Sequence, residues 1–144
     1  MKTYTILGIP VAQGRARTRV VKGVAMHYDP KKSKDAKDDI RSQVVQQNPV
    51  YYDAGPVQVD VTFEIPRPRA HFRANGQLKG NAPIFCDKKP DCSNYLKGLE
   101  DALNGILWRD DSQIAIVNVR KRYAAKEPKT VLTVLSLAAF REAV

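Results

Sequence analysis

The chain has 144 residues, a length that fits one domain, because a single hydrophobic core organises about 100–200 residues. Hydrophobic residues make up 43% of the chain and charged residues 27%, a balance that excludes wholesale disorder. The 24 Lys and Arg residues outnumber the 15 Asp and Glu residues, so the net charge is +9. Such an excess favours a polyanionic partner, because every neutralised phosphate releases condensed counterions.

The sequence also argues against a membrane protein and against a structural zinc site. No apolar run approaches the roughly 18–20 residues of a membrane span, and the N-terminus has no signal-peptide pattern. We therefore expect a soluble, cytoplasmic protein without a membrane partner. Cys86 and Cys92 are too few for a disulfide framework, and only His27 and His71 could join them around a metal. Both cysteines are expected to be free thiols.

The first third of the chain predicts a strand, a hairpin and a helix. Residues 3–9 alternate as in a strand. Apolar residues on both sides of Lys22-Gly23 predict a hairpin in which the glycine takes a positive φ. Asp29-Pro30 predicts a helix start, with Asp as N-cap and Pro in the first turn. That helix should continue to about Gln47.

The rest of the chain predicts three more strands and one helix. Residues 57–65 alternate regularly between apolar and polar types, as expected of a strand with one buried face. Residues 66–90 form a long loop rich in Pro, Gly and basic residues, and a connection of this length points to function. A helix should run from about Asn94 to Ile106, with Asn104-Gly105 as its C-terminal stop. Strands near 112–123 and 129–138 should follow it.

This order of elements predicts the fold class. Strands and helices mix without a strict β-α-β alternation, so the class is α+β. We expect a single domain over residues 1–144, with a mixed or antiparallel sheet flanked by two α-helices.

The densest group of chemically useful residues surrounds the second predicted helix. Asp91 lies just before it, Lys97 about a turn and a half along it, and Asp110 and Asp111 after it. A helix-turn-strand path would fold Asp110 and Asp111 back toward Asp91. Gathered carboxylates favour a hard cation such as Mg²⁺, which can activate water for attack on a phosphodiester. A nearby lysine can orient that water or offset negative charge.

Each of these residues also has a structural interpretation. Asp91 could cap the helix, and Asp110 and Asp111 could lie in a surface turn. Tyr95 and Trp108 are expected to pack in the core rather than against DNA bases.

A spaced set of residues resembles the signature of the RusA family, K-P-D-x-D-N-L-x-K, then D-A-L-N-G, then D-D-x-Q. The spacing is preserved from Lys89 through Asn104-Gly105 to Gln113. The N-terminal Gly8-Ile9-Pro10 with Arg15-Ala16-Arg17 is similar to the family's G-x-P…R-P-R, and residues 68–79 resemble its basic loop. The resemblance covers roughly residues 4–135.

This resemblance implies a homodimeric, bacterial or phage-encoded endonuclease that resolves four-way (Holliday) DNA junctions with Mg²⁺ or Mn²⁺. By position, Asp91, Lys97 and Asp111 are the expected catalytic residues, and Asp91, Asp110 and Asp111 the expected metal ligands. Basic residues near the site are expected to hold DNA phosphates: Arg15, Arg17, Arg67, Arg69, Arg73, Lys88 and Lys89. Phosphate contacts of this kind position a nuclease without selecting a base sequence. A side chain wedged at the crossover could supply sequence preference. Phe72 and Tyr95 are the candidates, although a core position is the stronger expectation for Tyr95.

One position departs from the family pattern, because Ser93 stands where the family has its second aspartate. Ser93 could act through water beside Asp91, Asp110 and Asp111, it could be a change that disables cleavage, or the chain could be a natural non-cutting relative. Ser93 also has a structural explanation as a helix N-cap. Ser93 motivates a competing hypothesis, a junction-binding protein without catalysis. A separate alternative is a structure-specific nuclease that acts on flaps or RNA.

Overall fold

A four-stranded mixed sheet forms the centre of the computed structural model, which describes residues 1–14, 17–28 and 31–143, without the side chains of 17–19 and 26–28. The strand order is β1 (Lys2–Leu7), β6 (Lys129–Ser136), β4 (Val57–Ile65) and β5 (Ile114–Tyr123). β6 pairs antiparallel with both β1 and β4, whereas β4 and β5 run parallel. The α+β class and the mixed sheet expected from the sequence are confirmed.

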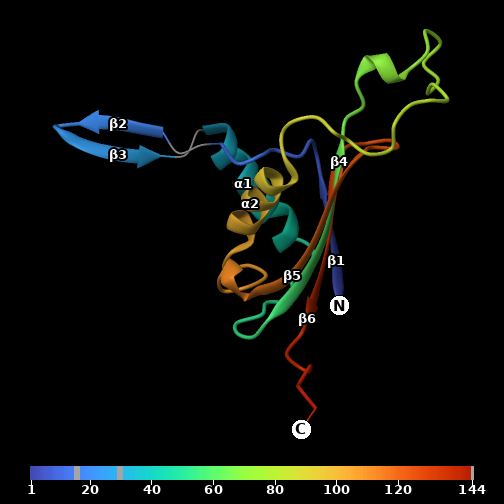
Figure 1. Cartoon of the computed structure of the whole chain (residues 1–144). Coiled ribbons are helices and arrows are strands. Elements are labelled where there is room, and N and C mark those ends of the chain that lie inside the picture. Colours follow the sequence, from blue (N-terminus) through green and yellow to red (C-terminus); the bar gives the residue numbers. More distant parts are fainter. Residues whose placement is uncertain (15–16, 29–30, 144) are drawn as a thin grey trace.

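Both helices, α1 (Lys31–Val45) and α2 (Cys92–Leu103), lie on one face of this sheet (Figure 1). The alternation of β4 explains why, since Val57, Val59, Val61 and Phe63 are buried and belong to the same core cluster as the buried face of α2. The intervening β4 residues face away from the helices and are polar. Asn118 and Arg120 of β5 donate hydrogen bonds to two of them, Asp60 and Thr62.

The boundaries of α2 differ from those predicted. The helix begins at Cys92, so of the two N-cap candidates it is Asp91, and not Ser93, that occupies the N-cap position. The helix ends at Leu103, before the predicted Ile106. The predicted Asn104-Gly105 stop is nevertheless in place, because Asn104 is the C-cap and Gly105 has φ 83°, which closes a helix without steric cost. The expected start of α1 at Asp29-Pro30 lies outside the described residues.

Two segments project from the body of the protein in different directions (Figure 1). One is the predicted hairpin, β2 (Arg17–Val21) and β3 (Val24–Tyr28), whose turn has positive φ at both Lys22 and Gly23. The other belongs to the long loop 66–90, which contains a short 3-10 helix, Arg69–His71. Both carry basic residues beyond the compact core.

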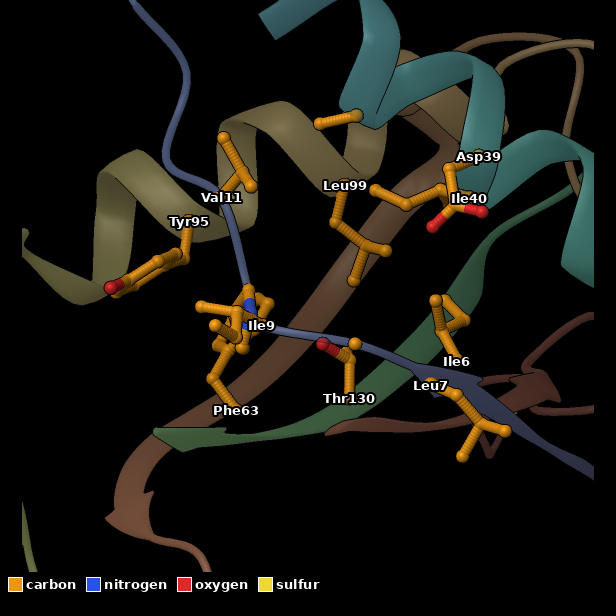
Figure 2. Close-up of a pocket in the computed structure, with 13 residues that line it drawn as sticks. Ile6, Leu7, Ile9, Val11, Asp39, Ile40, Phe63, Tyr95, Leu99 and Thr130 are labelled. Carbon is orange, nitrogen blue, oxygen red and sulfur yellow. The ribbon is translucent and has the colours of Figure 1, made fainter. Parts of the chain in front are cut away.

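The segment that follows β1 packs closely against α2. The amide of Gln13 donates to the carbonyl of Asn94, and a Cβ at Gly98 would lie 3.5 Å from the backbone of both Val11 and Gln13. Beside this segment lies an apolar pocket whose lining includes Ile9, Phe63, Tyr95 and Leu99 (Figure 2). None of the predicted catalytic residues lines it, so we interpret it as a packing gap between helices and sheet.

Candidate active site

Asp91 stands exposed at the start of α2 with its carboxylate uncommitted. It occupies the N-cap position, but its side chain makes no capping hydrogen bond. An N-cap aspartate ordinarily accepts a bond from the helix backbone, so both oxygens of Asp91 remain available to a ligand. Ser93 and Lys97, four residues apart, are also exposed on this helix. The structure thus places three of the motif positions on or beside the solvent-facing side of α2.

The segment leading to Asp91 is held against the edge of the sheet. The amide of Cys86 donates to the carbonyl of Lys121, and the amide of Tyr123 donates to the carbonyl of Ile84, at 3.2 and 2.9 Å. A bridge between Phe85 and Arg122 lies between these two bonds. The chain therefore enters α2 from a fixed position beside the last residues of β5.

Asp110 and Asp111 lie in a tight turn before β5, and the two carboxylates differ in their roles. Asp110 caps a short 3-10 helix, Asp111–Gln113, by accepting a 3.0 Å hydrogen bond from the amide of Ser112. Hydrogen bonding to Ser112 lowers the pKa of Asp110. Asp110, the predicted supporting ligand, is thus partly engaged in local structure. Asp111 is half-buried, whereas Asp110 is exposed.

Gln113 fixes this turn through four hydrogen bonds. Its Oε1 accepts from the amides of Arg109 and Asp110, at 2.8 and 3.1 Å. Its Nε2 donates to the carbonyls of Tyr52 and Gly55, both at 3.1 Å. The glutamine of the D-D-x-Q pattern therefore positions the aspartates, a role that the sequence pattern did not specify.

Asp111 belongs to an acidic group at the C-terminal end of α2. Burial raises the pKa of Glu100, and the nearby charges of Asp111 and Asp101 raise it further. Asp101 in turn lies 3.8 Å from the ammonium of Lys37 on α1. Arg41 of α1 donates to the carbonyls of Ala102 and Asn104 and so places positive charge at this end of the helix.

Within one protomer the two acidic positions are far apart. Asp91 and the acidic group around Asp111 lie at opposite ends of α2, whose 12 residues span about 18 Å at 1.5 Å per residue. The length of β5 gives the same result. Asp91 follows the segment that is bonded to Lys121 near the end of β5, whereas Asp111 lies before Ile114, the first residue of that strand. In the described part of the chain, no three His, Cys, Asp or Glu residues are grouped closely enough to hold a metal ion. The expected folding of Asp110 and Asp111 back onto Asp91 was therefore wrong for a single chain.

The basic residues predicted to hold phosphates fall into three sets. Arg69, Arg73, Lys88 and Lys89 are exposed on the long loop. Arg67 is instead engaged internally, donating to the carbonyl of Pro83 at 2.7 Å, contacting Nδ1 of His71 and stacking on Tyr123. Arg15 and the side chain of Arg17 lie outside the described residues.

The aromatic residues near the motif also separate into core and surface. Tyr95 is 6% exposed and stacks on Phe63 with ring centroids 5.2 Å apart, and Trp108 is fully buried with its indole N–H donating to Asn104. Packing roles for both were predicted and are confirmed. Phe72 and Phe85 of the long loop are exposed.

Comparison with known proteins identifies the family of this chain. The family described as endodeoxyribonuclease RusA matches residues 8–135. An uncharacterized protein of Bacillus subtilis (strain 168), YqaN, is 33% identical over 138 residues, which is 94% of this chain and 96% of that protein. No helix in the described residues combines the length and apolar character needed to cross a membrane. With a family match over nearly its whole length, the chain belongs to the RusA family of endodeoxyribonucleases.

Proposed function

We propose that this protein is an endodeoxyribonuclease that resolves four-way DNA junctions by paired phosphodiester hydrolysis. The family match supports nuclease activity on branched DNA. The observation that carries the proposal is the exposed carboxylate of Asp91 at the start of α2, which makes no capping bond. Only Pro90 separates Asp91 from the basic pair Lys88-Lys89. A phosphate drawn to these lysines would lie beside an acidic group able to bind a hard cation.

The proposed metal site uses Asp91 and Asp111, with Asp110 as support, and one protomer does not supply it as a group. Asp91 fits a hard cation by its chemistry, because its oxygens are exposed and free of capping bonds. Mg²⁺ or Mn²⁺ held by these carboxylates would supply an activated water and stabilise charge on the phosphate. Lys97, exposed on the same helix, would offset negative charge on the reacting phosphate oxygens.

A homodimer would complete this site. β5 is an edge strand, and among the described residues its outer edge pairs only through the Phe85–Arg122 bridge. It exposes 45% of Ile116 and 41% of Val117, so an apolar strand is left open to pairing. A two-fold axis at the middle of this edge exchanges its two ends. Such a rotation would bring Asp91 of one protomer toward Asp111 of its partner.

Ser93 carries the alternative function, binding of junctions without cleavage. A neutral hydroxyl replaces a carboxylate beside Asp91, so the site has one negative charge fewer than the family pattern. Ser93 is exposed in the first turn of α2, where a negative charge is favoured by the helix dipole. A Ser93→Asp variant should therefore fold normally, and it tests whether the lost charge limits cleavage.

The test is a gel assay on a synthetic four-way junction with Mg²⁺ or Mn²⁺, with linear duplex, flap and RNA substrates in parallel. The proposal predicts paired nicks in the junction that disappear in Asp91→Asn. The matched control is Asp35→Asn, which removes one exposed carboxylate from α1 and should leave the nicks unchanged.

Other outcomes have distinct meanings. Binding without nicks, with cleavage restored by Ser93→Asp, would support a nuclease scaffold that lacks one ligand. Equal cutting of junction and duplex would contradict the structure-selective function.

A further inference from the structure

Lys121 occupies a position on β5 where the alternation of the strand predicts an apolar side chain. It pairs in register with Phe63, and Val119 pairs with Val61, so these β5 residues lie on the sheet face that the helices cover. Tyr123, two residues further on, is buried. A lysine at such a position needs hydrogen-bond acceptors to compensate for the partial loss of water.

The ammonium of Lys121 has two such acceptors in residues 86–90, the segment that leads to Asp91. Its Nζ donates to the carbonyl of Lys88 at 2.6 Å and to the carbonyl of Pro90 at 2.8 Å. The backbone carbonyl of the same residue accepts from the amide of Cys86. One residue of β5 therefore contacts the chain at three points within the six residues that precede Asp91.

These contacts matter because residues 87–90 have few other restraints. Pro90 has no backbone N–H and so cannot donate to the sheet. The side chain of Lys88 is 77% exposed and that of Asp87 is 87% exposed. The carbonyl of Pro90 belongs to the residue directly before Asp91, so the lysine acts one peptide unit away from the carboxylate.

We propose that Lys121 is a positioning residue that sets the location of Asp91 through the carbonyls of residues 88 and 90. The proposal rests on the proposed function, because Asp91 is the group being positioned. Lys121 makes no ion pair with the Asp91 carboxylate among the described contacts, so its effect passes through the backbone. Its role differs from that of Lys88 and Lys89, whose side chains point outward to solvent.

Two variants of Lys121 and one control test this role. Lys121→Met keeps the aliphatic stem and removes the donor, whereas Lys121→Arg keeps a donor of a different shape. Arg120→Met is the matched control, since it removes one positive charge from the adjacent residue, which donates to Thr62 on the open face of the sheet.

In the junction assay, we expect Lys121→Met to bind the junction within about twofold of the wild type. It should nick at least tenfold more slowly and need a higher Mg²⁺ concentration for half-maximal rate. Lys121→Arg should restore part of the rate, and Arg120→Met should behave as the wild type. Unchanged nicking in Lys121→Met would overturn the proposal. The proposal would also be overturned if Lys121→Met lost only junction affinity and its binding depended on salt with a slope smaller by about one phosphate contact. That result would identify Lys121 as a direct DNA contact.

Amide hydrogen exchange on the free protein separates this proposal from the proposed function. Peptides covering residues 84–95 should exchange faster in Lys121→Met than in the wild type, whereas peptides from β4 and β6 should not change. This result would support the positioning role even if the wild type cut no junction. Unchanged exchange at residues 84–95 would overturn the role whatever the activity.

Discussion

Replacing Gln113 with alanine should loosen the turn that carries Asp110 and Asp111. The side chain makes four hydrogen bonds, two accepted from backbone amides and two donated to backbone carbonyls. A net hydrogen bond contributes about 0.5–1.5 kcal/mol, and the low end applies because Gln113 is half-exposed and water can replace part of each bond. Four bonds at about 0.5 kcal/mol give a loss of about 2 kcal/mol in the free energy of unfolding.

Denaturant and thermal unfolding measure this loss directly. About 2 kcal/mol corresponds to a fall of about 4–8 °C in Tm for a domain of this size. Gln46→Ala is the matched control, because it makes the same truncation at an exposed position just after α1. A Gln113→Ala protein within about 0.5 kcal/mol of this control would refute the reasoning, because ordinary surface substitutions fall within that range.

Two further predictions concern α2. Gly98→Ala should be tolerated, because its Cβ meets the backbone of Val11 and Gln13 at an ordinary 3.5 Å. Gly98→Val should lower the free energy of unfolding, measured with denaturant, by about 1–3 kcal/mol, because the larger side chain forces that segment away. Equal stability of the two variants would contradict the close packing. The pKa of Glu100 is raised by burial and by Asp111, so the folded state binds the proton more tightly and stability falls as pH rises above the ordinary pKa of 4.5. Glu100→Gln should therefore be more stable than the wild type at pH 7, and its stability should change less as the pH rises from 4.5. An unchanged pH profile would contradict this assignment.

Much of the fold could be predicted because it follows from local patterns. The regular alternation of residues 57–65 predicted β4 with the same bounds that the structure shows, and Asn104-Gly105 marked the end of α2. The start of α2 was misplaced for a physical reason. Both Asp91 and Ser93 are good N-cap types, and the residue used as N-cap makes no side-chain bond, so local chemistry did not distinguish them.

The site was predicted as a set of residues but not as an arrangement. The predicted helix-turn-strand path suggested that Asp110 and Asp111 fold back onto Asp91, whereas α2, about 18 Å long, separates them. The pattern of β5 could have indicated Lys121, because it is a charged residue at an inward position of an otherwise alternating strand. The engagement of Arg67 with Pro83, His71 and Tyr123 depends on tertiary contacts that no local pattern indicates.

The central claim is that the carboxylates of two protomers together form each cutting site. Mixing Asp91→Asn protein with Asp111→Asn protein tests it, after subunit exchange has been verified with two different tags. If the site is shared, half of the exchanged dimers are mixed and each has one intact site, which gives about a quarter of wild-type sites and single rather than paired nicks. We predict this recovery of nicking from two variants that are each inactive alone. No recovery after verified exchange would contradict the shared site and require Asp91 and Asp111 to act within one chain.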